Sequence, residues 1–250
     1  PEGDPERGML IVHGIGEHSG RWGHVAGFFI ELGYAVTAFD LRGHGHSGGT
    51  KVYVDSFNDY VDDLQSMVES GLVRTDLPWV IYGHSLGGFI SASYLAEDRP
   101  HPDAAVLSAP ALAAEVPGAL RVAAQVLGRV APKVALATPI DGEQLSRDAA
   151  VGEAYFNDPL VYTKATTGLA LETFSAQDRM LDMLASIDTP TLVIHGADDT
   201  LVAPSASAPL ASVDCVERKV YPGLRHEMHN EPEQAQVLSE VAAWLDAALA

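Results

Sequence analysis

Ser85 lies in a sequence pattern that is typical of a catalytic nucleophile. The surrounding residues, Gly83-His84-Ser85-Leu86-Gly87, match G-x-S-x-G, with an apolar run before them and a helix-like segment after them. A sharp turn from strand to helix demands small residues two positions on either side of the serine. The start of the helix then directs free N–H groups at any negative charge that develops nearby. An ordinary glycine-rich turn is the alternative, but the flanking strand and helix patterns favour a nucleophile.

A serine hydroxyl needs a base to activate it, and the base needs an acid to orient it. Two later apolar runs supply such groups in the order serine, acid, histidine. Asp198 and Asp199 follow the run Thr191–Ile194, and His226 follows the run Val216–Tyr221. Parallel strands present their carboxyl ends at one edge of a sheet, where the ligand sites of open α/β sheets lie. We therefore expect the serine, an aspartate and a histidine to meet at that edge.

The residues alone leave two choices open. Asp198 and Asp199 are adjacent, and we expect one of them to be a solvated turn residue. His229 competes with His226 as the base. We expect His229 at the start of the final helix, as a surface group or as a support for the site.

A nucleophilic serine also needs backbone N–H groups that stabilise the oxyanion formed during attack. The residue after the nucleophile, Leu86, supplies one of them. The loop His13-Gly14-Ile15-Gly16 follows the first apolar run, where a second donor is expected, so we assign that donor to Ile15. The two glycines let this backbone approach a substrate oxygen.

His44 and His46 are the residues that most suggest a metal site. They are separated by one glycine, and no carboxylate stands at a matching spacing. A glycine-rich structural loop explains them better than a metal centre does. We expect no metal and no other cofactor.

The elements that must position these groups alternate between short β-branched runs and longer helical patterns. This alternation predicts an α/β fold with a mostly parallel central sheet and helices on both faces. The predicted strands are Gly8–His13, Tyr34–Asp40, Trp79–His84, Ala104–Ser108, Thr191–His195 and Val216–Tyr221. The predicted helices are His24–Leu32, Ser56–Glu69, Leu86–Glu97, Ser205–Ser212 and Glu231–Leu249. Asn230 is the expected N-cap of the last helix, with Pro232 in its first turn.

One region, residues 111–189, interrupts the alternation and divides the predicted core into residues 1–110 and 190–250. It contains helical patterns and loops without a clear strand, and it is far longer than an ordinary connection of about 2–6 residues. Its first part, Val116–Leu136, has apolar residues at helical spacing, with Gly128 and Pro132 predicting a break or bend. Extra core packing is one interpretation. We favour a helical cap over the carboxyl ends of the strands.

Composition excludes several classes of function. The 250 residues include 15 Lys and Arg against 34 Asp and Glu, a net charge of −19, which disfavours nucleic-acid binding. The hydrophobic fraction of 47% is enough for a sizeable core. The single cysteine, Cys215, excludes an internal disulfide.

Neither a membrane span nor a signal peptide is visible, so we expect a cytoplasmic or loosely membrane-associated protein. The chain begins at Pro1 without Met, so we expect upstream residues to be missing, and secretion stays open.

Taken together, these motifs resemble the serine hydrolases of the α/β-hydrolase fold. Within that fold, the chain is similar to the monoacylglycerol lipase and lysophospholipase-like group, which includes the S33-type serine aminopeptidases. The resemblance spans nearly the whole chain. It is carried by His13-Gly14-Ile15-Gly16-Glu17-His18-Ser19-Gly20-Arg21, Asp40-Leu41-Arg42-Gly43-His44-Gly45-His46-Ser47-Gly48, Gly83-His84-Ser85-Leu86-Gly87-Gly88 and, in the insertion, Pro139-Ile140-Asp141, Leu145-Ser146-Arg147 and Tyr155-Phe156-Asn157-Asp158-Pro159-Leu160.

The resemblance selects between the open choices. The acid loop of the group reads His-Gly-x-x-Asp-x-x-Val, which selects Asp199, and its Tyr-x-Gly-x-x-His stretch selects His226. The resemblance also implies an initial β-hairpin, which we expect this chain to lack because it starts too late.

The resemblance further implies a polar pocket for a glycerol head, matched by Glu17, Arg21, His84 and Tyr155. A salt bridge between Glu17 and Arg21, four residues apart, is the alternative for that pair. The implied activity is cofactor-free hydrolysis of monoacylglycerols, with a small lipid ester as partner and transient contact of the cap with lipid surfaces. Hydrolysis of lysophospholipids or medium-chain esters stays open, and so do a peptidase that uses Glu17 and a ligand-binding protein without turnover.

Overall fold

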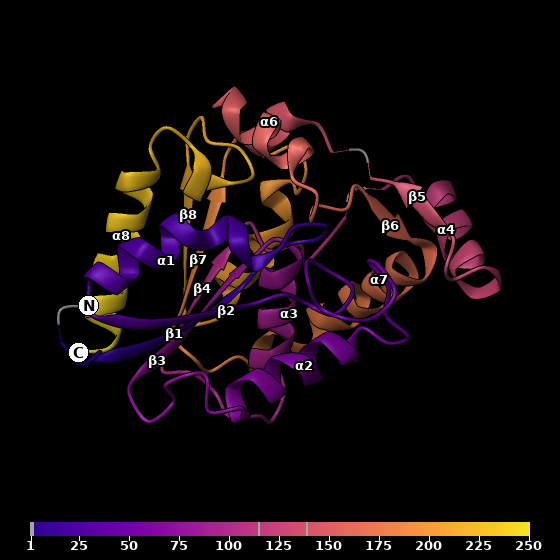
Figure 1. Cartoon of the computed structure of the whole chain (residues 1–250). Coiled ribbons are helices and arrows are strands. Elements are labelled where there is room, and N and C mark those ends of the chain that lie inside the picture. The colour runs from indigo at the N-terminus through magenta and orange to yellow at the C-terminus, as the bar shows by residue number, and fades with distance from the viewer. Residues whose placement is uncertain (1–2, 115, 139) are drawn as a thin grey trace.

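A computed structural model describes residues 3–114, 116–138 and 140–250, and its centre is a six-stranded sheet. All neighbouring strands pair in parallel, in the order β2-β1-β3-β4-β7-β8 (Figure 1). The strands are β1 (Arg7–Val12), β2 (Tyr34–Phe39), β3 (Trp79–His84), β4 (Ala104–Ser108), β7 (Thr191–Gly196) and β8 (Val216–Tyr221). The predicted parallel sheet is confirmed, because each predicted apolar run forms one of these strands.

Helices cover both faces of the sheet, as the sequence predicted. α1 (Gly23–Glu31) and α8 (Gln234–Ala248) cover one face, and α2 (Asn58–Glu69) and α3 (Leu86–Leu95) cover the other (Figure 1). Side chains alternate along β1 between the two resulting cores, with Met9 and Ile11 in one and Leu10 and Val12 in the other. This alternation follows from the pleat of a strand that is buried on both faces.

Two predicted helices differ most from the structure, one in its type and one at its start. Residues Pro204–Ser212 form a 3-10 helix, η3, with Pro209 inside it, and proline removes the N–H that a regular helix needs there. The last helix begins at Gln234, so the expected N-cap at Asn230 is wrong. Asn230 instead ends a short 3-10 helix, η4 (Met228–Asn230), and its side chain donates a hydrogen bond to Glu227.

The insertion contains α4 (Gly118–Val130), α5 (Gly142–Leu145), α6 (Ala149–Asn157) and α7 (Thr167–Met183), followed by the 3-10 turn η2 (Leu184–Ser186). It also contains two strands that the sequence did not predict, β5 (Ala135–Ala137) and β6 (Lys164–Thr166), which pair antiparallel. Each has only three residues, too few to show an alternating pattern. The motif residue Pro139 lies outside the described residues.

Gly128 serves close packing rather than a break in α4, contrary to the prediction. The helix continues through Gly128 and ends at Val130. A Cβ atom at Gly128 would lie 2.6 Å from the carbonyl oxygen of Thr167 at the start of α7, so only glycine allows this approach. In Figure 1, α4 and β5 lie at the outer edge of the molecule, and α7 lies between α4 and the core.

Candidate active site

Ser85 lies at the turn between β3 and α3 in a strained backbone conformation. Its φ of 52° and ψ of −118° are unusual for a residue with a side chain and cost about 1–3 kcal/mol. Its N–H donates to the carbonyl oxygen of Ser108 over 2.9 Å, and its own carbonyl oxygen accepts from the N–H of Ala111 over 3.1 Å. A Cβ at Gly83 would lie 2.4 Å from Ser91 Oγ, and one at Gly87 would lie 2.2 Å from a backbone oxygen of β1. Both glycines are therefore required for the turn to pack.

The histidine and acid loops meet beside this turn. His226 Nδ1 lies 2.7 Å from Asp199 Oδ2. The other carboxylate oxygen of Asp199 accepts from the N–H groups of Leu201 and Val202, each over 2.9 Å. Because Nδ1 faces a carboxylate, it carries the proton and leaves Nε2 free to act as a base. Asp198 is exposed, so only Asp199 contacts the histidine.

Charge and burial act against each other in this pair. Burial alone would raise the pKa of Asp199, but the charge of His226 and the hydrogen bonds from His195 and His226 hold that pKa well below its usual range. Burial alone would lower the pKa of His226, but the charge of Asp199 and its hydrogen bond raise it above its usual value. The structure therefore favours an ionised aspartate that stabilises an imidazolium.

The loop after β1 approaches the serine closely. A Cβ at Gly14 would lie 3.1 Å from Ser85 Cβ, so the glycine lets the backbone reach the nucleophile. Ile15 and Leu86, the two predicted oxyanion donors, border the same cavity as Ser85. Leu86 is the first residue of α3, where a helix has no internal partner for its N–H groups. Both residues predicted to supply the oxyanion donors thus border the cavity that contains Ser85.

A cavity of about 590 Å³ joins these groups beneath the insertion. Apolar side chains from the core and the insertion form most of its wall. They include Ile15, Leu86, Val116, Ile140, Leu145, Leu169, Phe174, Leu201 and Val202. The polar side chains are those of Glu17, His84, Ser85, Thr138, Gln144, Tyr155, Thr173, Gln177, Thr200, His226 and Glu227. Such a wall suits a ligand with a long apolar part and a small polar part.

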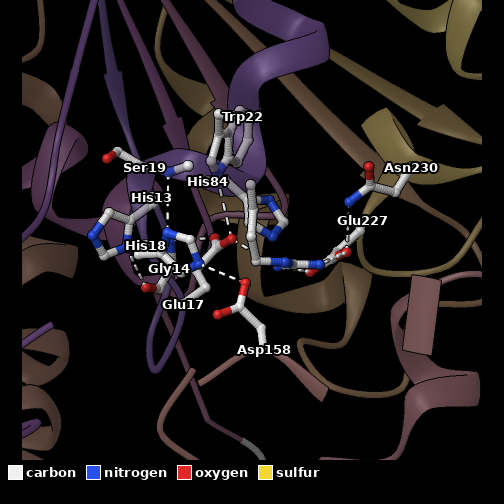
Figure 2. A network of polar contacts seen from close by, with 12 residues as sticks. His13, Gly14, Glu17, His18, Ser19, Trp22, His84, Asp158, Glu227 and Asn230 are labelled. Atoms are coloured by element: carbon white, nitrogen blue, oxygen red, sulfur yellow. Dashed lines mark hydrogen bonds and ion pairs between the residues drawn. The ribbon is translucent and has the colours of Figure 1, made fainter. Parts of the chain in front are cut away.

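The residues predicted to hold a glycerol head occupy two layers. Glu17, His84 and Tyr155 border the cavity, whereas Arg21 is not among the residues that border it. Arg21 Nη1 donates to Glu17 over 2.7 Å, so the salt bridge considered from the sequence is present. The same guanidinium also donates to both carboxylate oxygens of Glu227, each over 2.7 Å (Figure 2).

The sequence reasoning missed Glu227. Its only sequence signal is its position directly after His226, at the same strand end. Burial alone would raise its pKa, but the charge of Arg21 holds that pKa below its usual value. Burial raises the pKa of Glu17, helped by the charge of Glu227 and opposed by that of Arg21. The two carboxylates therefore share one guanidinium.

Tyr155 and His84 complete the polar wall. The Tyr155 hydroxyl is buried and has no hydrogen-bond partner within residues 3–114, 116–138 and 140–250. The ring of Tyr155 lies 4.9 Å from the Arg21 guanidinium carbon, and burial raises the pKa of its hydroxyl. The His84 ring lies 4.7 Å from that of His226, and burial holds its pKa well below the usual value, so His84 is neutral.

His229 lies in the interior, so the surface position expected for it is wrong, whereas the alternative of a group that supports the site agrees with its contact to His84. It belongs to η4, is 1% exposed, and stacks on Trp22 with ring centres 4.0 Å apart. Burial holds the pKa of His229 well below its usual value. It therefore packs behind the site as a neutral ring.

The insertion is tied directly to the histidine loop. The N–H of Glu227 donates to the carbonyl oxygen of Leu145 in α5 over 2.8 Å. Glu231, whose side chain is fully buried, accepts from the N–H of Arg225 over 2.7 Å with one oxygen. Its other oxygen accepts from the Ser146 hydroxyl over 3.3 Å and from the Arg147 N–H over 3.1 Å. One buried carboxylate thus links the residue before His226 to the end of α5.

Comparisons with known proteins agree with this geometry. The family described as serine aminopeptidase, S33, matches residues 3–233. The chain belongs to this family. A monoacylglycerol lipase from Mycolicibacterium smegmatis is 39% identical over 98% of this chain and 90% of its own length. The human monoglyceride lipase is 33% identical over 98% of this chain and 84% of its own length.

A solved structure extends the likeness to three dimensions. The crystal structure of a monoacylglycerol lipase from Paleococcus ferrophilus has a TM-score of 0.89 and 29% identity, covering 98% of this chain and 96% of that one. The predicted resemblance is confirmed. This S33-family protein is an ester hydrolase with the α/β-hydrolase fold.

Three further features of this S33-family hydrolase bear on a metal site or a membrane span. His44 is buried beside His13, and burial lowers the pKa of His44 to about 3, so it is a neutral structural ring. Within the described ranges, no group of three or more His, Cys, Asp or Glu side chains is arranged to hold a metal ion. No helix in the described part of the chain has both the length and the apolar character needed to cross a membrane.

Proposed function

We propose that this hydrolase releases fatty acids from monoacylglycerols through an acyl-enzyme on Ser85. The observation that carries the proposal is one cavity that combines a largely apolar wall with Ser85, His226 and a short polar wall. The apolar wall suits one acyl chain, and the polar wall suits a small alcohol. The names of the relatives in Mycolicibacterium smegmatis and humans support the same substrate class.

The proposed reaction uses the geometry of the three loops. Ser85 Oγ attacks the ester carbonyl while His226 Nε2 takes its proton, and Asp199 stabilises the resulting imidazolium. The N–H groups of Ile15 and Leu86 bind the oxyanion. His226 then gives its proton to the leaving alcohol, and the acyl group remains on Ser85. Water, activated by the same histidine, releases the fatty acid and restores the serine.

The alcohol leaves beside the polar wall. His226 must reach the leaving oxygen, so the rest of the alcohol lies against the side chains next to His226. Glu17 and Glu227 offer acceptor oxygens there, and Tyr155 and His84 offer further polar atoms. Two free hydroxyls of glycerol satisfy such groups. A second or third acyl chain would place apolar surface against them, which disfavours triacylglycerols.

We also propose that the insertion, residues 111–189, is a cap that contacts lipid surfaces through α4. Four large apolar side chains of this helix are exposed, those of Leu120, Val122, Val126 and Val130. The segment 116–140 contains three basic residues and no acidic one, in a chain with a net charge of −19. An apolar face with basic residues favours contact with a lipid surface. This arrangement fits an enzyme loosely associated with a membrane.

A substrate panel tests the proposal against its alternatives. We expect 1- and 2-monoacylglycerols to be hydrolysed well and trioleoylglycerol hardly at all. Preferential hydrolysis of lysophospholipids or medium-chain esters would instead support those two alternatives. Faster release of amino-terminal residues from peptides would support the peptidase, although Glu17 already binds Arg21. Absence of any turnover and of fluorophosphonate labelling would indicate a binding protein.

The head-group assignment has its own test in Tyr155→Phe, which removes only the unpaired hydroxyl. Losing one hydrogen bond to the alcohol costs about 1–1.5 kcal/mol, so KM for monoacylglycerol should rise roughly tenfold. KM for a nitrophenyl ester without glycerol should not change. Tyr60→Phe is the matched control, because the Tyr60 hydroxyl is also buried without a described partner but lies away from the cavity. Equal changes on both esters would remove Tyr155 from the head-group site.

A further inference from the structure

The polar wall of the cavity contains more negative than positive charge. Glu17 and Glu227 border the cavity and share the single guanidinium of Arg21. Among the described residues, no lysine or arginine side chain borders the cavity. Burial raises the pKa of Glu17, so the net charge of this cluster depends on the hydrogen bonds that its carboxylates receive. With both carboxylates ionised, one guanidinium leaves one negative charge in this part of the wall.

The hydrogen bonds around both carboxylates match their ionised forms. Glu17 accepts from the N–H of Gly14 over 2.6 Å and from the indole N–H of Trp22 over 3.3 Å, in addition to Arg21. Glu227 accepts from the side-chain amide of Asn230 over 2.7 Å, in addition to Arg21 (Figure 2). Every one of these partners is a donor, and an ionised carboxylate is an acceptor only.

Arg21 is held away from the substrate by these bonds. Nη1 donates to Glu17 and Glu227, and Nη2 donates to Glu227. Turning the guanidinium toward a ligand would leave two buried carboxylates without their cation, which is strongly unfavourable. The wall therefore presents acceptor oxygens to the substrate, and its positive charge stays behind them.

We propose that the Glu17–Arg21–Glu227 cluster selects the leaving alcohol by charge, with Glu227 as a specificity-determining residue. The inference rests on the proposed function. Neutral alcohols with free hydroxyls donate to the carboxylate oxygens and are accepted. Alcohols that carry a phosphate, such as the head of a lysophosphatidic acid, are rejected. The phosphate would place its own acceptor oxygens and negative charge against the acceptor oxygens and negative charge of the wall. The enzyme is thus a hydrolase of neutral rather than phosphorylated monoacyl lipids.

The test compares kcat/KM for 1-oleoylglycerol and 1-oleoylglycerol 3-phosphate in the same detergent micelles. Placing like charges together costs several kcal/mol, so the wild-type ratio should be about 100 or more. Glu227→Gln leaves one carboxylate for Arg21 and makes the cluster neutral, so the ratio should fall about tenfold. Glu143→Gln, an exposed change on α5 with the same loss of charge, should leave the ratio unchanged.

The outcomes separate this inference from the proposed function. Wild-type enzyme that does not hydrolyse 1-oleoylglycerol would overturn the proposed function. Wild-type enzyme that hydrolyses it, with a ratio near one or with an unchanged ratio in Glu227→Gln, would overturn the charge selection alone. A general loss of structure in Glu227→Gln would lower the hydrolysis of both lipids together and would not change the ratio of their kcat/KM values.

A second measurement uses only the wild-type enzyme, in case Glu227→Gln does not fold. Glycerol and glycerol 3-phosphate are compared as inhibitors of nitrophenyl butyrate hydrolysis. The proposal predicts that glycerol inhibits and that glycerol 3-phosphate at the same concentration does not. Equal or stronger inhibition by glycerol 3-phosphate would overturn the proposal.

Discussion

Two parts of the insertion, α5 and α4, are built in opposite ways. At α5, backbone and buried polar groups join the insertion to the loop of His226, through Leu145, Ser146 and Glu231. At α4, the helix packs against α7 and exposes a row of apolar side chains. The difference indicates that α4 and α5 have separate roles within the insertion. Changes near α5 should alter the rate on every ester, whereas changes on α4 should alter only how lipid substrates are reached.

The largest expected effects come from Ser85 and from His226, whose loop is bonded to α5. Ser85→Ala and His226→Ala should each lower kcat by a factor of about 10⁶, because nucleophile and base act as a unit. The double variant should be scarcely worse than either single variant. Loss should be equal on monoacylglycerol and on a soluble nitrophenyl ester. Residual activity above a few per cent in Ser85→Ala would show that another residue is the nucleophile.

Asp198 and Asp199 are adjacent, but only Asp199 contacts His226, so replacing each in turn tests which of them is the catalytic acid. Asp199→Asn should lower kcat by roughly 10⁴, because an amide cannot hold the required imidazole tautomer. Asp198→Asn is the matched control, since its side chain is exposed on the same turn, and it should keep most of the activity. Steady-state rates on one soluble ester are sufficient. The reverse order of effects would move the catalytic acid to Asp198.

Glu231 tests whether α5 positions the histidine loop. Glu231→Gln places an amide NH₂ against donors, which costs about 1–3 kcal/mol and should lower the melting temperature by several degrees. We expect kcat to fall roughly tenfold on all esters, with KM little changed, because the displaced loop carries His226. Glu153→Gln, the same change at an exposed position of α6, should alter neither quantity. A lower melting temperature with an unchanged kcat would make Glu231 purely structural.

The smallest effect is expected at α4. Replacing Val122 and Val126 together by serine should lower activity on monoacylglycerol in vesicles several-fold, since apolar surface is lost from the helix that we propose contacts lipid. Hydrolysis of soluble nitrophenyl butyrate should not change. Leu72→Ser is the matched control, because Leu72 is similarly exposed and lies between α2 and β3, outside the insertion. Equal losses of activity on both substrates would contradict the claim that α4, unlike α5, affects only lipid substrates.

The core was predictable from sequence because its signals are local. Buried parallel strands are short apolar runs, and G-x-S-x-G marks the turn at Ser85 regardless of the rest of the fold. The order of the strands then brings Ser85, Asp199 and His226 to one edge. The same reasoning predicted Ile15 at the cavity, because its loop follows the first strand.

The features that the sequence did not predict depend on contacts between segments that are distant in the chain. The strands β5 and β6 are too short to have a period, and Gly128 is explained only by the approach of α7. Glu227 shares Arg21 with Glu17 across more than two hundred residues of sequence, and nothing in its neighbourhood indicates that partner. The sequence around His229 predicts the start of a helix, and only the structure shows that its ring stacks on Trp22.

The most direct test of the central claim is the mass of the enzyme during turnover. Wild-type protein is mixed with excess 1-oleoylglycerol, quenched with acid within the first turnovers, digested and analysed by mass spectrometry. We predict an oleoyl group on the peptide that contains Ser85, absent from Ser85→Ala, together with release of glycerol ahead of oleate. Glycerol and oleate released together without any acyl-peptide, or an acyl group on a different residue, would contradict the account.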